Sequence, residues 1–407
     1  MTQIRLLVAV VTAAVVIAWP LTLSGAAARP TSATRLSAAQ TARVDAAVGK
    51  IVSSSLVPGA QLAIERRGAV VYERAYGVAD AARKKAVNLR TRFEIGSITK
   101  QVTAAAVLQL VEAHRLNLDD PLEKYVPQYK PGAAVTLRQL MWQTTGIPDY
   151  TALPRFMHST INTPGSFERI LALIADKPLD FAPGTRWAYS DTNYILLGRV
   201  IEAASKMSYN EYIREHIFRA AGMSRTGTIA DEGAMRDMAT GYSSRNGRQG
   251  PTARFSDPWA WSAGNIVSTA ADVLKWDDAL FRGKLLSLQS VALMTTPGTL
   301  SDGTPTSYAM GWVVDTQDGH KRIWHNGGTV GFGSSNMLYP DDGLRIVALI
   351  NDASIPPETL TARVFEALNP GLAAATDHAV AYEDPAVTPR AKDIMRGLRR
   401  VIYTRPL

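Results

Sequence analysis

Runs typical of β-strands lie at both ends of this chain around a helical middle, and this arrangement constrains the fold most. Residues 60–65 and 70–76 are rich in β-forming side chains and flank the turn Arg66-Arg67-Gly68, which predicts a hairpin. Similar runs return in the last third, at residues 308–314, 322–325, 334–339 and 345–350. We therefore expect one mainly antiparallel sheet built from N-terminal and C-terminal segments.

Helical periodicity dominates the rest of the chain. It appears at residues 41–54, 102–116, 167–175, 195–204, 270–280 and 360–368. The chain has 407 residues, 46% of them hydrophobic, which is enough for a large core. The sequence thus predicts an α/β protein of the α+β type, with helices flanking the sheet and a largely helical inserted region. A site would fall between these two parts.

The first 28 residues have the pattern of a secretory signal peptide. Arg5 precedes an apolar stretch at residues 6–19, Pro20 ends that stretch, and three alanines at 26–28 suit cleavage. An uncleaved membrane anchor is the alternative, although the stretch is short for a membrane span. Residues 29–40, rich in Ala, Ser, Thr and Pro, are expected to be a linker. We predict a periplasmic or secreted protein.

A basic tail is expected at residues 371–407, after a folded domain at residues 41–370. Within the tail, residues 390–407 carry +5 of the net charge of +8, because six basic residues and one acidic residue lie there. The tail could contact acidic lipid or wall polymers weakly. Alternatively it is partly helical, and Ile394, Leu398 and Ile402 dock on the domain. No nucleic-acid motif is present, and the absence of Cys excludes disulfides and an N-terminal lipid-modified Cys.

The tetrad Ser97-Ile98-Thr99-Lys100 is the first candidate for chemistry. A Ser hydroxyl becomes a good nucleophile only when a base removes its proton. On a helix that begins near Ser97, Lys100 lies one turn further and its amine can reach the hydroxyl. The free N–H groups of the helix start could also stabilise an oxyanion. Taken alone, the tetrad is equally consistent with a helix-capping Ser and a surface Lys.

Two further segments complete the candidate site. Tyr189 precedes a helix start, and a neighbouring ammonium group could lower its phenol pKa so that it moves protons. His325, Gly327 and Gly328 lie at the end of a predicted strand, where glycines let the backbone approach a substrate and the Gly328 N–H could donate to an oxyanion. Ordinary packing for Tyr189 and a Gly-rich turn for residues 325–328 are the alternatives.

Together, these segments resemble the serine β-lactamase and penicillin-binding-protein superfamily, in its class C-like branch. Ser97 to Lys100, Tyr189-Ser190-Asp191 and His325-Asn326-Gly327 stand in the order of its three motifs, and residues 137–150 and 217–227 match further. The resemblance implies a β-lactamase/transpeptidase-like fold. It also implies an acyl-enzyme on Ser97, with Lys100 and Tyr189 as proton carriers and the Ser97 and Gly328 N–H groups around the oxyanion. It implies no metal or organic cofactor, and it leaves open which residue takes the first proton.

Two departures from the motifs bear on the substrate. Asp191 replaces the usual Asn, so it can only accept hydrogen bonds, and it should favour a protonated Lys100 and shift the base role toward Tyr189. His325 replaces a permanent cation suited to a substrate carboxylate. We therefore expect hydrolysis of a small-molecule or peptide ester or amide, including D-amino-acid peptides. The alternatives are a β-lactamase and a non-catalytic protein that binds wall fragments or another protein.

Overall fold

The computed structural model describes residues 35–53, 57–154, 156, 159–245, 248–252 and 257–371. The predicted signal peptide, residues 29–34 of the predicted linker and all of the predicted tail except residue 371 lie outside these ranges. Within them, every helix is too short or too polar to cross a membrane.

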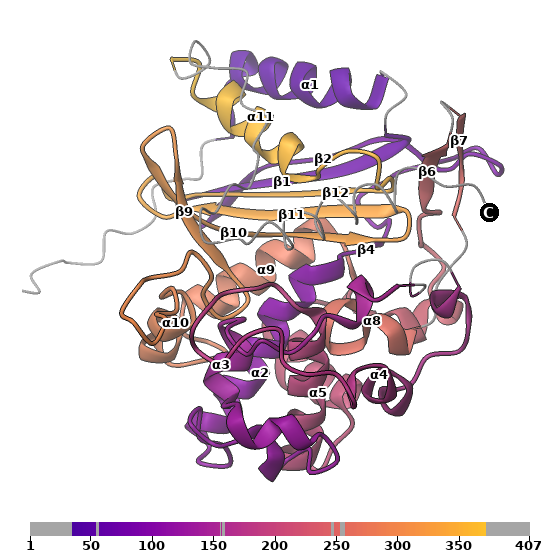
Figure 1. The fold of residues 1–407 in the computed structure, drawn as a ribbon. Helices are drawn as coiled ribbons and strands as arrows, with labels where there is room; N and C mark the ends of the chain where they lie inside the picture. The colour runs from indigo at the N-terminus through magenta and orange to yellow at the C-terminus, as the bar shows by residue number, and fades with distance from the viewer. Residues whose placement is uncertain are drawn as a thin grey trace, which may run out of the picture. The chain divides into compact units, whose positions relative to one another are not determined.

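A seven-stranded antiparallel sheet joins the two ends of the domain, as the sequence predicts (Figure 1). β1 pairs with β12 along its length, from Ala60 opposite Ile350 to Arg66 opposite Leu344. In sheet order the strands are β3 (Lys85–Ala86), β2 (Ala69–Asp80), β1 (Gly59–Arg66), β12 (Leu344–Ile350), β11 (Phe332–Tyr339), β10 (His320–Thr329) and β9 (Val313–Gln317).

The predicted strand at residues 308–314 is largely wrong. β9 begins only at Val313, and Tyr308 joins it through a single bridge. The reason is a turn at Gly311, whose φ is +80° and where a Cβ would lie 2.8 Å from the Lys100 carbonyl oxygen. Only glycine fits this close approach at a positive φ.

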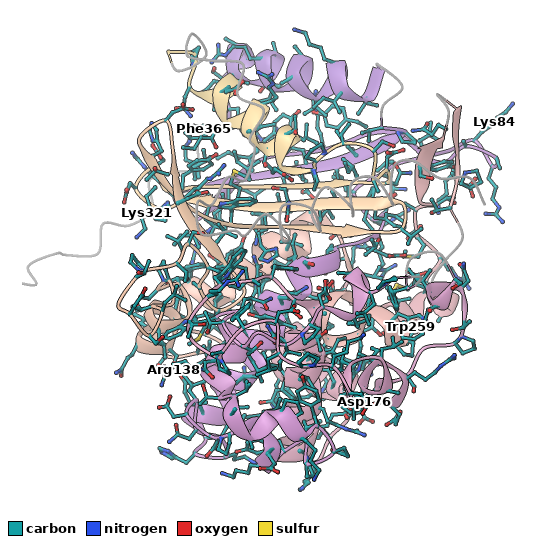
Figure 2. The ribbon with its side chains drawn as sticks, viewed as in Figure 1. Lys84, Arg138, Asp176, Trp259, Lys321 and Phe365 are labelled. Atoms are coloured by element: carbon teal, nitrogen blue, oxygen red, sulfur yellow. The ribbon has the colours of Figure 1, made fainter. Side chains whose placement is uncertain are left out.

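Helices cover both faces of the sheet (Figure 1). α1 (Ala38–Ser53) and α11 (Glu358–Leu368) lie on one face, where Phe365 stacks on Tyr339 with ring centroids 3.9 Å apart (Figure 2). α9 (Ala270–Phe281) packs on β1 and β12 from the opposite face. β12 therefore alternates: Ile346 and Ala348 belong to the core under α1 and α11, and Val347 and Leu349 belong to the core of the helical region.

The central helix of the inserted region is α2 (Thr99–Glu112), which packs against α5 (Asp191–Ser205) and α8 (Asp257–Gly264). Every residue of α2 from Thr99 to Leu108 is buried, so the helix has no solvent face over this stretch. The sequence predicts its end at Leu116, but the helix stops at Glu112 because His114 adopts a φ of +55°. Lys100 therefore enters the interior of the protein on the first turn of this helix.

Shorter elements complete the inserted region. The helices are α3 (Leu137–Met141), α4 (Phe167–Ile174), α6 (Tyr209–Ile213), α7 (Arg219–Ala221) and α10 (Leu288–Met294). β4 (Phe93–Glu94), β8 (Ile266–Ser268) and β5 (Gly227–Thr228) form a small sheet, and β6 (Tyr242–Arg245) and β7 (Arg248–Pro251) form a hairpin. Between β4 and α2 lies one 3₁₀ turn, η1 (Gly96–Ile98), which contacts β10 and β11 of the large sheet.

Candidate active site

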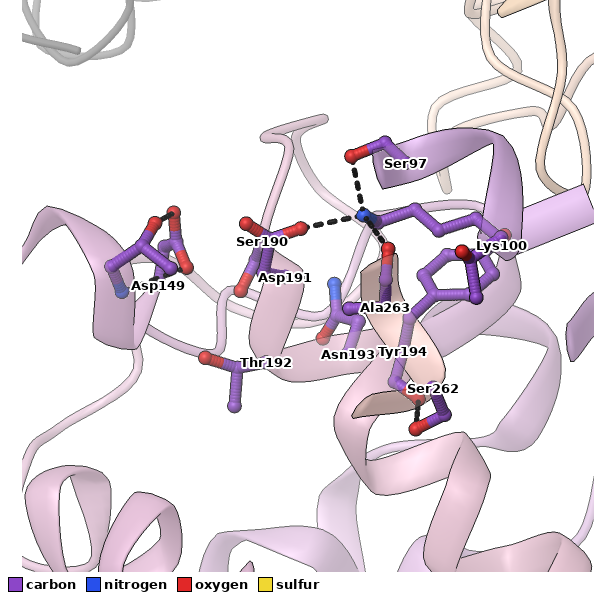
Figure 3. A network of polar contacts seen from close by, with 12 residues as sticks. Ser97, Lys100, Asp149, Ser190, Asp191, Thr192, Asn193, Tyr194, Ser262 and Ala263 are labelled. Atoms are coloured by element: carbon purple, nitrogen blue, oxygen red, sulfur yellow. Dashed lines mark hydrogen bonds and ion pairs between the residues drawn. The ribbon is translucent and has the colours of Figure 1, made fainter. Parts of the chain in front are cut away.

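Ser97 lies where the helical region meets the sheet. It occupies η1, directly after Gly96, whose φ is +49°, and its side chain is partly exposed. Lys100 follows one turn later with a fully buried side chain, and its Nζ donates to Ser97 Oγ at 2.9 Å (Figure 3). The structure thus brings the predicted nucleophile into contact with the predicted amine.

The Lys100 amine has two further acceptors. Nζ donates to Asp191 Oδ1 at 2.5 Å and to the Ala263 carbonyl oxygen at 2.8 Å (Figure 3). Together with Ser97 Oγ, these acceptors match the three protons of an ammonium group. Burial lowers the pKa of Lys100, and the Asp191 carboxylate opposes this effect without cancelling it. The lowered pKa brings the neutral amine, which can act as a base, within easier reach.

Tyr189 joins the same cluster from the segment before α5. The Ser97 hydroxyl lies close enough to favour the ionised form of the phenol, and the Tyr189 ring centroid lies 4.9 Å from Lys100 Nζ. The side chain keeps some exposed surface, but the surrounding protein displaces most water from the phenol. This desolvation, followed by the Asp191 carboxylate, raises the pKa of Tyr189 well above its ordinary value. The expectation that the ammonium group lowers this pKa is therefore wrong, because burial and Asp191 outweigh it.

His325 faces this cluster from β10. Its Nδ1 lies 2.5 Å from the Asn326 carbonyl oxygen and its Nε2 lies 3.1 Å from the Tyr308 hydroxyl. A carbonyl oxygen only accepts, so Nδ1 carries the proton and Nε2 accepts from Tyr308. Burial and the nearby Lys100 charge lower the pKa of His325 to about 3. The imidazole is therefore neutral at physiological pH. The Asn326 side chain points to the other face of the sheet, where it donates to Glu358 at 2.9 Å.

The two glycines that end the third motif pack directly against the seryl turn. A Cβ added to Gly327 would lie 2.0 Å from the Ile95 carbonyl oxygen and 2.9 Å from Ser97 N. A Cβ added to Gly96 would lie 2.7 Å from Gly328 N. The Ser97 and Gly328 amides are thus held beside each other. Gly328 is exposed, and a Cβ added there would meet no atom within 4 Å, so this side of the turn is open.

Comparisons with known proteins show the family of the chain. Residues 44–368 match the family described as Beta-lactamase. The chain belongs to the beta-lactamase family. It is 28% identical over 321 residues to Protein flp of Staphylococcus aureus, a match that covers 76% of this chain and 62% of the relative. The chain thus spans about six-tenths of the length of the first curated relatives that it matches.

Two solved structures give the same assignment. A penicillin-binding protein homologue from Pyrococcus abyssi is octameric, aligns with a TM-score of 0.72 and is 27% identical, over 81% of this chain and 77% of its own. A D-stereospecific amidohydrolase from Streptomyces aligns with a TM-score of 0.67 at 27% identity, over 82% of this chain and 98% of its own. The predicted fold and superfamily are confirmed. The similar proteins thus include an amidohydrolase and penicillin-binding proteins or their homologues.

Several residues that brace the site in this beta-lactamase-family chain received no role from the sequence. Gln143 Oε1 accepts from Ser190 N at 3.1 Å and from Asn193 Nδ2 at 2.5 Å, and Asn193 Oδ1 accepts from Thr145 Oγ1 at 2.7 Å. These bonds fix the start of α5, and with it Tyr189 and Asp191. The signal in the sequence was the polar run at residues 143–145 inside the matching segment 137–150. The structure buries all three of these residues.

Asp149 is a second carboxyl group near Lys100 that sequence reasoning missed. It accepts from Thr151 N at 3.2 Å and Thr151 Oγ1 at 2.6 Å, and so caps the 3₁₀ turn η4 (Tyr150–Ala152). Burial and the neighbouring Asp191 carboxylate raise the pKa of Asp149 to about 7. Near neutral pH, Asp149 is therefore protonated in part of the molecules.

Proposed function

We propose that this chain is a serine hydrolase that cleaves an ester or amide bond through an acyl-enzyme on Ser97. One observation carries the proposal: a partly exposed hydroxyl accepts a hydrogen bond from a buried amine and lies near a phenol and two backbone amides. These are the parts that acyl transfer requires, namely a nucleophile, a base, a proton carrier and oxyanion donors.

In the acylation step, the neutral amine of Lys100 takes the Ser97 proton while Oγ forms a bond to the substrate carbonyl carbon. The carbonyl oxygen becomes an oxyanion, and the Ser97 and Gly328 N–H groups donate to it. When the intermediate collapses, the bond from carbon to the leaving nitrogen or oxygen breaks. The proton then passes from Lys100 through the Tyr189 hydroxyl to that leaving atom.

Water completes the cycle. It adds to the acyl carbon and gives a proton to the same pair of groups, and the bond between carbon and Ser97 Oγ then breaks. Ser97 regains its proton and a carboxylic acid leaves. We assign the first proton transfer to Lys100 because burial lowers its pKa, whereas the pKa of Tyr189 is raised. This assignment reverses the shift toward Tyr189 that the sequence suggested.

The test is covalent labelling of Ser97. A fluorophosphonate should add its mass to the wild-type protein at Ser97, and Ser97→Ala should lose both the adduct and ester hydrolysis. Ser190→Ala is the matched control, because the Ser190 hydroxyl is buried without a hydrogen-bond partner among the described residues. It should label as the wild type does. A folded wild-type protein that forms no adduct would refute the proposal.

We also propose that esters and amides are better substrates than β-lactams, since the neutral His325 offers no charge to a β-lactam carboxylate. A chromogenic cephalosporin turned over faster than simple esters would contradict this ranking. Export to the periplasm or beyond remains our proposal from the sequence. Recovery of the protein in the cytoplasmic fraction of its host would contradict it.

A further inference from the structure

We infer that the site selects acyl groups that carry a protonated amine next to the scissile carbonyl, and that Asp191 binds this amine. The substrates would then be aminoacyl esters and amides. This inference rests on the proposed function, because it assumes that Ser97 attacks the carbonyl.

Asp191 is placed to meet such a group. Lys100 Nζ contacts both Ser97 Oγ and Asp191 Oδ1, so the carboxylate lies two hydrogen bonds from the attacking oxygen (Figure 3). A substrate group that reaches Asp191 must therefore lie close to the reacting carbon, as an α-amine does. The helix start at Asp191 favours a carboxylate there, since the first residues of a helix stabilise negative charge.

The exposed member of this ion pair is the carboxylate. The Asp191 side chain keeps 25% of its surface exposed, and the Lys100 side chain keeps none. Lys100 Nζ donates to Asp191 Oδ1, and no described residue donates a hydrogen bond to Asp191 Oδ2. One carboxylate oxygen is thus free to accept from a ligand. An Asn at this position could donate through its amide, whereas an ionised Asp demands a donor from the substrate.

The groups around Asp191 also favour a positively charged ligand. Ser97, Asp191 and Ala263 already occupy the three donor positions of Lys100. Both ring nitrogens of His325 are engaged, and its low pKa keeps the ring neutral. The described groups around Ser97 thus provide a free acceptor and no available cation, so the site favours an ammonium group and disfavours a carboxylate.

Two matched pairs of ligands test this inference. The first compares hydrolysis of alanine 4-nitroanilide, as each enantiomer, with hydrolysis of propionyl 4-nitroanilide, which lacks only the amine. At pH 6.5 and low salt, the preferred enantiomer should have a kcat/KM at least about tenfold higher, which corresponds to ~1.4 kcal/mol. The second measures how well alaninamide and propionamide protect Ser97 from fluorophosphonate labelling. This measurement decides the question even where neither anilide is cleaved.

In Asp191→Asn, two ratios should be close to one: the ratio of kcat/KM for the alanine and propionyl anilides, and the ratio of protection by alaninamide and propionamide. Asp176→Asn, at an exposed carboxylate on the surface beyond α4, should keep the wild-type values of both ratios (Figure 2). A wild-type ratio near or below one, or a ratio that survives Asp191→Asn, would overturn the inference. If Asp191→Asn does not fold, the salt dependence of the wild-type protein tests the inference instead. The preference of the wild type for the amine-bearing ligand should fall in 0.5 M NaCl, because salt screens a partly exposed pair of carboxylate and ammonium. An unchanged ratio would count against Asp191. Failure of Ser97 labelling would instead overturn the proposed function.

Discussion

Gly327→Ala should disable the site without adding any polar group. The new methyl carbon would lie 2.0 Å from the Ile95 carbonyl oxygen and 2.5 Å from Ser334 Oγ, both far inside ordinary contact distance. Ile95 and Ser334 are themselves tied together, because Ser334 Oγ donates to the Ile95 carbonyl oxygen at 2.7 Å. Neither can move away alone, so β10 must shift away from the seryl turn.

The expected loss follows from the size of that shift. An ordinary contact of the methyl carbon needs at least 3.4 Å instead of 2.0 Å, so β10 must move about 1.4 Å away from the Ile95 carbonyl oxygen. A misplacement of about 1 Å can cost about 10²-fold in rate, and loss of one oxyanion donor costs about 10²–10³-fold. Because Gly328 follows directly on the same strand, its N–H moves with the strand. We expect kcat/KM on a small activated ester to fall by about 10²–10³-fold.

Gly328→Ala is the matched control, one residue further along β10. A Cβ there meets no atom within 4 Å, so the strand keeps its place. The assay is steady-state hydrolysis of 4-nitrophenyl acetate by both variants, with circular dichroism to show that each is folded. Gly328→Ala should remain within about tenfold of the wild type. The reasoning fails if folded Gly327→Ala retains wild-type activity, or if both variants lose activity equally.

Three further predictions concern the groups behind the site. Gln143→Ala leaves two buried donors without an acceptor, so urea denaturation should show a free energy of unfolding lower by roughly 2–4 kcal/mol; an unchanged value would contradict the bracing role. Burial raises the pKa of Asp277 to about 7, above its unfolded value, so its ionisation destabilises the fold as pH rises from about 4 through 7. Asp277→Asn should therefore gain in melting temperature over the wild type between pH 5 and pH 8, and an equal difference at both pH values would refute this. Asp191→Asn removes a charge that raises the pKa of Lys100, so the acidic limb of the kcat/KM profile should move to lower pH; movement to higher pH would exclude Lys100 as the base.

Much of the fold could be predicted because the apolar runs and the turn residues that bound them indicate the same strands. β1 and β12 each bury both faces, and their apolar runs are bounded by turns, so strand positions were correct within one or two residues. One failure occurred where a tertiary contact overrides local preference: residues 308–312 look like a strand but turn at Gly311 to pass the backbone of α2. The early end of α2 is local, because His114 adopts a positive φ and the Arg115 N–H donates back to the Leu110 carbonyl oxygen.

The candidate site also has contacts that the sequence could predict and contacts that it could not. The spacing of Ser97 and Lys100 on one helix turn is local, and their contact could be anticipated from the sequence. The positions of Tyr189 and Gly328 depend on long-range packing, and only the order of motifs suggested that they would meet Ser97. The signs of the pKa shifts could not be anticipated, because desolvation depends on how completely the folded chain surrounds each group. Burial therefore reversed the expected shift of Tyr189.

The way the site is assembled ties activity to the closure of the large sheet. Ser97 and Lys100 come from the inserted region, whereas Gly327 and Gly328 come from a strand that follows it in the chain. The two parts are joined where η1 packs on β10, and β1, which precedes the inserted region, pairs with β12, which follows it. Neither part alone holds a nucleophile beside two oxyanion donors. A substitution that weakens the pairing of β1 with β12 should therefore lower activity at denaturant concentrations where the helices are still folded.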